Sequence, residues 1–208
     1  MSLHHILKEL QRNSDSKKRE SYKRFFKDSY TNKTDRFIGV SLLQQRKVAK
    51  NHPNLSYQDF KKLLNSDIHE YRMLGGILLV NRFRNIKEEQ ENVFDFYLKN
   101  IKRFNNCDLV DVTADKIVGK FLLNRKKKRK ILYELSKSKN LWEKRIAIVS
   151  TLELIRNKEF GDALKISEKL MNDKHDLIHK AIGWILREVG KRDKEVLLDF
   201  LKTNYKKM

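Results

Sequence analysis

The sequence predicts an all-α fold of HEAT-like helical-hairpin repeats, which stack into a curved α-α superhelix with a concave basic face. Three observations predict this class. The 208 residues include one Pro and seven Gly, so few positions interrupt a helix. Leu, Ile, Lys and Glu are abundant, and the period-two alternation typical of β-strands is absent. A pattern also recurs at the length of two helices and two turns, and we expect one domain over residues 1–208.

The helical periodicity of apolar residues gives the expected elements in chain order. Residues that favour N-caps precede three of them: Ser56 the fourth, Asp67 the fifth, and Ser138 or Asn140 the ninth. The lengths suit short packed helices rather than a coiled coil. The expected helices are 3–12, 15–29, 42–52, 57–65, 68–84, 88–104, 108–123, 126–137, 140–156, 159–171, 175–189 and 193–204.

The repeat appears when the sequence is aligned with itself. The segment His69–Leu78 matches Trp142–Thr151 and Leu177–Leu186, and a weaker copy begins near Asn105. Its length is near that of tetratricopeptide repeats, but their Trp, Gly, Tyr and Pro pattern is missing, which favours HEAT-like repeats. The matching anchor residues are spaced 36, 37 and 35 residues apart, and they are Arg72, Asp108, Arg145 and Lys180.

Equivalent positions of stacked repeats form a row across one face, usually the concave binding face. The anchors therefore predict a row of surface residues. Helix geometry adds Asp111 and Trp184, which lie three or four residues beyond an anchor. Two carboxylates, Asp108 and Asp111, would then lie inside a basic row. A surface that only bound phosphates would not be expected to carry them, because they repel such a ligand.

The charge balance predicts a polyanionic partner. The chain has 47 Lys and Arg against 27 Asp and Glu, a formal charge of +20. An acidic membrane surface is the alternative partner, but basic membrane segments usually concentrate on one amphipathic helix. Here the basic residues run from Lys17 to Lys207, which favours nucleic acid. We expect a monomer that binds DNA and no membrane.

Cysteine content and hydropathy predict an intracellular, cytoplasmic protein. The single cysteine, Cys107, excludes an intramolecular disulfide framework, and the first residues lack the apolar stretch of a signal peptide. The longest apolar run, near Gly75 to Val80, is far shorter than a membrane-spanning helix requires. We expect association with the nucleoid when the protein is on DNA.

Three motifs occur in order at compatible spacing: Asn106–Asp111, Asn140–Ile148 and Lys180–Glu188. A looser match is Phe37–Val40 followed by Gln45 and Arg46. These residues resemble the bacterial DNA alkylation repair proteins of the AlkD type, which are HEAT-like alkylpurine DNA glycosylases. The resemblance runs over most of the chain.

The resemblance implies excision of cationic N3- or N7-alkylated purines from duplex DNA without flipping the base into a pocket. By its motif position Asp111 would be the catalytic carboxylate, stabilising positive charge on the deoxyribose and orienting the attacking water. Trp184 would lie against the sugar and backbone of the lesion, and Arg145 would hold an adjacent phosphate. No cofactor and no metal is expected. Further substrate contacts are expected from Cys107, Lys180, Arg72 and Arg187.

The sequence departs from the family pattern at three places, one of which, Leu43 where many relatives have Pro, is expected to affect a turn only. Cys107 stands where the family commonly has Trp, which pairs with the equivalent of Trp184 to wall the site. The chain stops at Met208, where relatives continue into another helix, so we expect the domain to lack its last C-terminal helix. Two alternative functions are a catalytically silent relative that only binds DNA and a scaffold for an acidic protein partner.

Several motifs also have a structural interpretation. Taken alone, Asp111 is a first-turn carboxylate that the helix dipole favours. The run Arg125–Lys130 suits a phosphate clamp, a nuclear targeting stretch or a solvated helix face. His175 and His179 have the spacing of a helical metal pair, but Asp176 replaces the Glu of the metalloprotease motif and no third ligand is evident.

Overall fold

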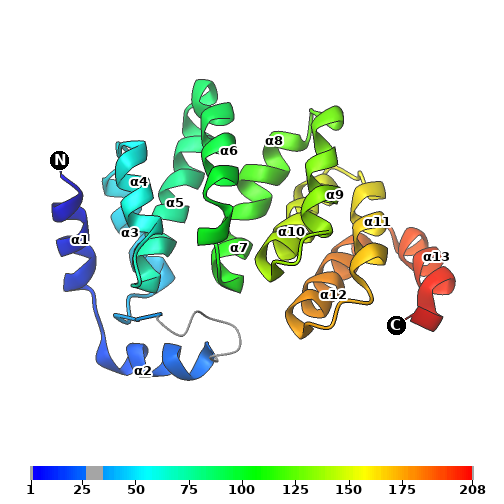
Figure 1. Ribbon diagram of the computed structural model, residues 1–208, viewed down its shortest axis with the longest axis horizontal. Coiled ribbons are helices and arrows are strands. Elements are labelled where there is room, and N and C mark those ends of the chain that lie inside the picture. The colour runs from blue at the N-terminus through cyan, green and yellow to red at the C-terminus, as the bar shows by residue number, and fades with distance from the viewer. Residues whose placement is uncertain (1, 27–34, 208) are drawn as a thin grey trace. The chain divides into compact units, whose positions relative to one another are not determined.

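The computed structural model describes residues 2–26 and 35–207. Within these residues every regular element is helical, apart from one isolated β-bridge between Arg36 and Ile68 (Figure 1). The all-α class is therefore confirmed. Backbone contacts divide the chain into two compact units, Met1–Leu109 and Val110–Met208, and each is described by itself. The expectation of a single domain stays a prediction.

The first unit consists of short helices that pack around α5. This helix contacts α3, α4 and α6, and residues on all of its sides are buried. A helix that is buried all round is typical of the inner position in a stack of helical hairpins. Its helices are α1 (Leu3–Arg12), α2 (Ser16–Phe25), α3 (Leu42–Asn51), α4 (Tyr57–Leu64), α5 (His69–Asn85) and α6 (Gln90–Lys99), with 3-10 turns η1 (Lys87–Glu89) and η2 (Ile101–Arg103). Helix α7 (Cys107–Ala114) begins in this unit and ends in the next.

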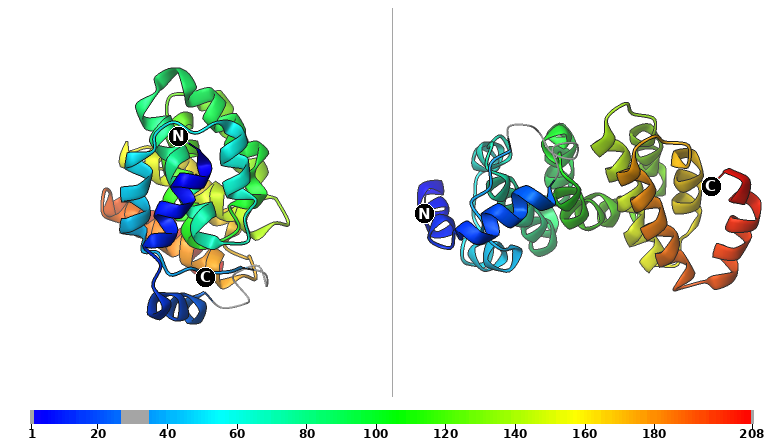
Figure 2. Two further views of the ribbon diagram at one scale, coloured as in Figure 1. Left: turned by 90° about the vertical axis from the view of Figure 1, so that its left-hand side faces the viewer. Right: turned by 90° about the horizontal axis from the view of Figure 1, so that it is seen from below.

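The second unit is arranged in the same way around α10, which contacts α9, α11 and α12. Figure 2 shows these neighbouring helices from two further sides. Its elements after α7 are the π-helix η3 (Asp115–Gly119), α8 (Lys120–Leu122), η4 (Lys126–Arg129), α9 (Lys130–Ser136), α10 (Leu141–Arg156), α11 (Gly161–Leu170), α12 (Asp176–Gly190), α13 (Lys194–Asn204) and η5 (Tyr205–Lys207). The central positions of α5 and α10 agree with their alignment in the sequence repeat.

Local capping explains where several helices begin. The Ser56 hydroxyl accepts the N–H of Asp59 at the start of α4, and the Asn140 side chain accepts two N–H groups at the start of α10, as predicted. The predicted cap at Asp67 is wrong. The N-cap of α5 is Ile68, whose N–H is bound by the Ser66 hydroxyl, while Asp67 pairs with Arg36 at 3.4 Å.

Several predicted helices differ from the structure. The stretch 88–104 divides into η1, α6 and η2, and the stretch 108–123 contains the π-helix η3. At η3 the backbone of Gly119 lies so close to α10 that a Cβ atom would stand 2.3 Å from the Ser150 carbonyl oxygen. Periodicity does not predict such a close approach, because it depends on a neighbouring helix. The predicted helix 15–29 ends at Phe25, and residues 27–29 lie outside the described part of the chain.

Candidate functional site

The central feature of the second unit is an ion pair between α7 and α10. Arg145 Nε donates to Asp111 Oδ1 at 3.0 Å, and Arg145 Nη2 donates to Asp111 Oδ2 at 2.8 Å. This paired geometry fixes the plane of the carboxylate as well as its position. The Arg145 side chain is 6% exposed, whereas that of Asp111 is 31% exposed. A carboxylate with a fixed orientation is therefore presented to solvent by a buried guanidinium.

Arg145 also connects the Asp111–Arg145 ion pair to α12. Its Nη1 donates to the Leu177 carbonyl oxygen at 2.6 Å, so each nitrogen of the guanidinium makes a hydrogen bond within the unit. The sequence predicts a phosphate contact for Arg145. In the structure its guanidinium is buried and directed at Asp111 and Leu177, which favours a positioning role over direct contact with DNA.

A mixed basic and aromatic stripe runs along α12. Leu177, Lys180, Trp184 and Arg187 recur every three or four residues, so they share one face of the helix. Lys180 and Arg187 are exposed and Trp184 is half-buried. A Cβ atom added at the neighbouring Gly183 would meet no atom within 4 Å, so the helix surface there is open. Cations on both sides of an indole suit contact with a sugar-phosphate backbone.

The structure brings some of the predicted residues together. Asp111 contacts Arg145 directly, and Trp184 lies on the helix that Arg145 binds, two turns after Leu177. Lys180 pairs with Asp176 at 3.1 Å and remains exposed. Cys107 is partly exposed at the start of α7, one turn before Asp111 along the same helix.

The anchors of the first unit have other surroundings. Arg72 is 2% exposed, and it donates to Asp35 Oδ2 at 2.6 Å and to the Ser66 carbonyl oxygen at 2.8 Å. These bonds give Arg72 a structural role, and a contact with DNA stays an untested prediction for it. Asp108 Oδ2 lies 2.8 Å from Nε2 of the buried His69. Sequence reasoning assigned no role to His69, although it is the first residue of the aligned repeat segment.

The two histidines of α12 have local roles. His175 is the N-cap, and its Nδ1 accepts the N–H of Leu177 at 3.2 Å. His179 Nε2 lies 2.5 Å from the Asp173 carbonyl oxygen. Burial acts to raise the pKa of Asp173, but the Lys144 ammonium and the His175 N–H hold that pKa below its ordinary value. Among the described residues no cluster of three His, Cys, Asp or Glu side chains is placed to hold a metal ion.

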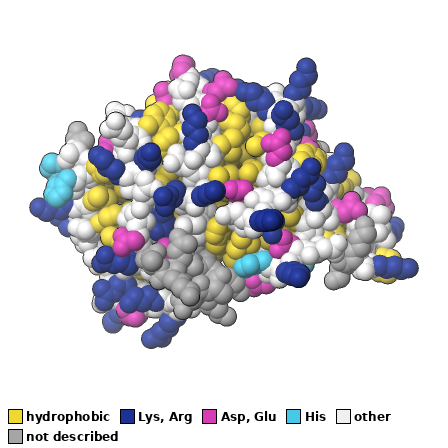
Figure 3. All heavy atoms as spheres, viewed as in Figure 1, with side chains coloured by type: hydrophobic (Ala, Val, Ile, Leu, Met, Phe, Trp, Pro, Cys, Tyr) yellow, Lys and Arg dark blue, Asp and Glu magenta, His cyan; other side chains and the backbone are white. Residues whose placement is uncertain are grey.

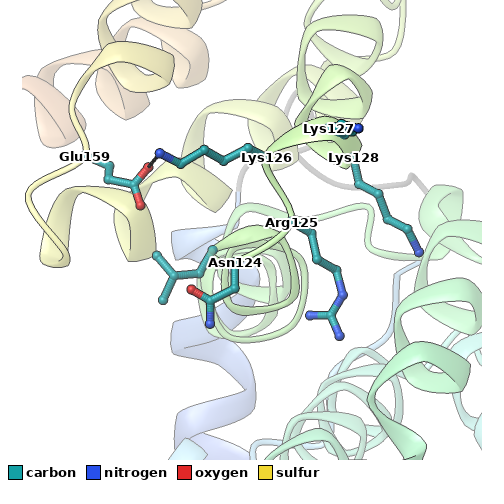
Figure 4. Close-up of a pocket in the computed structure, with 7 residues that line it drawn as sticks. Asn124, Arg125, Lys126, Lys127, Lys128 and Glu159 are labelled. Carbon is teal, nitrogen blue, oxygen red and sulfur yellow. Dashed lines mark ion pairs between the residues drawn. The ribbon is translucent and has the colours of Figure 1, made fainter.

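The basic run Arg125–Lys130 divides into a buried cation and a set of exposed ones. Figure 4 shows exposed members of the run lining a pocket, with Lys126 paired to Glu159. Arg129 is 6% exposed, and its Nη1 donates to Glu159 at 2.7 Å and to Asp162 at 3.1 Å. Although burial opposes its charge, these carboxylates raise the pKa of Arg129 above its ordinary value. Arg125 instead lies exposed over the ring of Phe121, with its guanidinium carbon 4.1 Å from the ring centroid.

Replacing Arg129 by Met is expected to lower the free energy of unfolding by about 2–3 kcal/mol, because two carboxylates lose their cation. The effect is smaller than for a fully buried pair, since the Glu159 side chain is 34% exposed. Urea denaturation measures it. The matched control is Lys127→Met in the same run, which is exposed and is expected to change stability by less than about 0.5 kcal/mol. Equal losses in both variants would contradict the structural role of Arg129.

Comparison with known proteins identifies the family. The family model described as DNA alkylation repair enzyme matches residues 6–208. The chain belongs to the DNA alkylation repair enzyme family. Membership confirms the resemblance seen in the motifs, and it places this DNA alkylation repair protein in a class whose substrate is DNA.

The fold of this DNA alkylation repair protein is shared with a solved structure. That structure is described as a predicted DNA alkylation repair enzyme from Enterococcus faecalis, with a TM-score of 0.68 and 16% sequence identity. The match covers 92% of this chain and 90% of the other. A comparison with curated proteins gave no match. No helix in the described residues has the length and apolar character needed to cross a bilayer.

Proposed function

We propose that the protein is a DNA glycosylase that excises cationic N3- or N7-alkylated purines from duplex DNA without base flipping. One observation carries the proposal. The buried Arg145 holds the Asp111 carboxylate by paired hydrogen bonds while 31% of the Asp111 side chain stays exposed. A negative charge that is fixed before the substrate arrives can stabilise positive charge that develops during a reaction.

Because the lesion is already cationic, a fixed carboxylate would be sufficient for catalysis without protonation of the leaving base. Alkylation at N3 or N7 gives the purine a positive charge, so the base leaves as a neutral molecule when the glycosidic bond breaks. The bonding electrons go to the purine, and positive charge develops on C1′ of the deoxyribose. Water then adds to C1′ and loses a proton, which leaves an abasic site. Asp111 would stabilise the sugar cation and orient that water.

Other residues have supporting roles in this proposal. Trp184 lies against the sugar and backbone of the lesion, while Lys180 and Arg187 bind phosphates on either side of it. Arg145 positions Asp111 rather than binding a phosphate, because its side chain is nearly fully buried. Arg72 is left out, since it is buried in its own ion pair. The spread of Lys and Arg over the face seen in Figure 3 supports binding to a polyanion.

The test is base release by the wild-type protein from duplex DNA that carries N7-methylguanine, measured by chromatography with a metal chelator present. We expect release of the cationic base and an abasic site in the product. The control substrate is a matched duplex with hypoxanthine, a neutral lesion, from which we expect no release. Equal release of neutral and cationic bases would contradict the proposal, because the carboxylate is assigned no role in protonating a leaving base.

A second candidate function is DNA binding without excision. Cys107, one turn before Asp111, stands where an aromatic wall of the site is expected. Without that wall the lesion would be held less firmly. Tight, salt-dependent binding of the methylated duplex with no release by the wild-type protein would favour this function. Weak binding with little salt dependence would instead favour the scaffold for an acidic protein.

A further inference from the structure

Helix α2 is a short basic helix of the first unit with no buried residue. Its 10 residues include one carboxylate, Glu20, and five cations, Lys17, Lys18, Arg19, Lys23 and Arg24. A polar helix of this length is marginal in water when isolated. Contacts with the rest of the unit must therefore hold it, and those contacts determine where its charges lie.

The N-terminal end of α2 is held against the loop before α3. The Asp15 N–H donates to the Ile38 carbonyl oxygen at 3.3 Å. Gly39 has a φ of +81°, and a Cβ atom there would lie 2.0 Å from the Asp15 carbonyl oxygen, so only glycine permits this approach. The same loop is bound by the fully buried Glu70 of α5, whose carboxylate accepts the N–H of Gly39 at 2.8 Å.

The C-terminal end of α2 is held by aromatic contacts. Tyr22 packs edge-on against Phe37 at 6.3 Å between ring centroids, and Phe26, just after the helix, stacks on Phe37 at 5.3 Å. Phe26 also lies 5.1 Å from the ring of His69, at the start of α5. Burial, followed by the nearby charges of Glu70 and Asp108, raises the pKa of Tyr22. The C-terminal end of α2 thus contacts the first turn of α5, and the N-terminal end contacts the loop that Glu70 of α5 binds.

The contacts of α2 within the first unit extend to the start of α7. His69, which contacts Phe26, lies 2.8 Å from Asp108 on α7. Asp108 is three residues before Asp111 on the same helix. Within the first unit, α2 is therefore held near His69 and Asp108.

The face of α2 opposite Tyr22 carries Lys17, Ser21 and Arg24, which line a shallow exposed pocket together with Ser16 and Glu20. Glu20 is already paired with Lys23 at 3.1 Å and with Arg19 at 3.5 Å. Within residues 2–26 and 35–207, Lys17 and Arg24 make no ion pair. They stand two turns apart on one side of the helix, about 10 Å along its axis. Both side chains are exposed, so their charges face solvent.

We propose that α2 is a docking surface for the phosphate backbone of duplex DNA, with Lys17 and Arg24 as the contacts. This inference rests on the proposed function, because that function makes duplex DNA the partner of the protein. Duplex DNA is favoured over an acidic membrane because Phe25, 73% exposed, is the only large apolar side chain that α2 exposes, and one ring does not form the apolar face that would enter a bilayer.

The test compares the double variant Lys17→Gln/Arg24→Gln with the charge-matched control Arg84→Gln/Lys87→Gln. The control residues are exposed near the other end of α5, about 22 Å from His69. Binding of unmodified duplex is measured over a range of salt concentrations, and circular dichroism checks the helical content. Each lost phosphate contact lowers the slope of log affinity against log salt by about 0.9. We expect the α2 variant to lose about 1.8 from the slope, with affinity weaker by on the order of ten-fold or more, and the control to match wild type.

Three results would overturn the inference. In the first, the α2 variant keeps the wild-type slope. In the second, the control loses as much slope as the α2 variant. In the third, duplex binding is unchanged while binding to vesicles of phosphatidylcholine and phosphatidylserine falls, which would assign α2 to membranes. Because the duplex is unmodified, this measurement does not depend on excision. Base release can fail while the slope changes as expected, and the two proposals can therefore fail separately.

Discussion

Replacing Asp111 by Asn is expected to lower the single-turnover rate of N7-methylguanine release by about 100-fold or more, equivalent to at least about 2.7 kcal/mol of transition-state stabilisation. Asn has nearly the same shape as Asp but no charge. It also presents an amide group to Arg145, which donates to both carboxylate oxygens in the wild type. The ground-state affinity for DNA is expected to stay unchanged or rise, because a charge that repels phosphates is removed.

The measurement uses enzyme in excess over the methylated duplex, so that the rate reports the chemical step rather than product release. The matched control is Asp199→Asn on α13, which removes the same charge from a side chain that is 76% exposed. We expect its release rate to equal that of wild type. If Asp111→Asn keeps the wild-type rate while it binds DNA normally, the carboxylate is not the catalyst and the proposed mechanism is wrong.

The repeat found in the sequence corresponds to shared chemistry in the structure. Arg72 and Arg145, which align in the repeat, each bind one carboxylate and one backbone carbonyl group. The two pairs differ in the exposure of the carboxylate. The Asp35 side chain is 2% exposed and that of Asp111 is 31% exposed. Of these two pairs, only that of Asp111 presents its negative charge to a ligand.

Sequence periodicity could predict the helices but not this difference in exposure. The apolar spacing of α5 and α10 is a local property, and so are the caps at Ser56 and Asn140. The partner of Arg145 is 34 residues away in sequence, and its bond to Leu177 spans 32 residues. Such distant pairings depend on how hairpins stack. Periodicity therefore placed Arg72 and Arg145 in one surface row, whereas the structure buries both guanidinium groups.

The sequence pattern also could not predict where α2 lies in the first unit. The motif Phe37–Val40 was recognised only as a loose family match. Its role in the structure depends on the positive φ of Gly39 and on the buried carboxylate of Glu70, which binds the loop from another helix. A charge such as that of Glu70 is not expected in the core unless it is fully hydrogen-bonded, and periodicity carries no information on those bonds.

Arg145→Lys separates a positioning role from a phosphate contact. Lysine keeps the positive charge but cannot form two parallel hydrogen bonds to a carboxylate, so the orientation of Asp111 is lost. We expect release of N7-methylguanine to slow by about 10–100-fold, as for a small misplacement of a catalytic group. The salt slope of DNA binding is expected to stay at the wild-type value, because Lys keeps the charge. Thermal melting checks that the variant is folded at the assay temperature.

The double variant Arg145→Lys/Asp111→Asn distinguishes a positioning role of Arg145 from a direct phosphate contact. If Arg145 acts through Asp111, adding Arg145→Lys to Asp111→Asn is expected to slow release by less than about two-fold further, because residues that act as a unit are not additive. A direct phosphate contact predicts the opposite. The two effects would then multiply, because each substitution would remove a separate contribution to the rate. That outcome would return Arg145 to the role predicted from its motif, and it would remove the physical reason for a fixed carboxylate at Asp111.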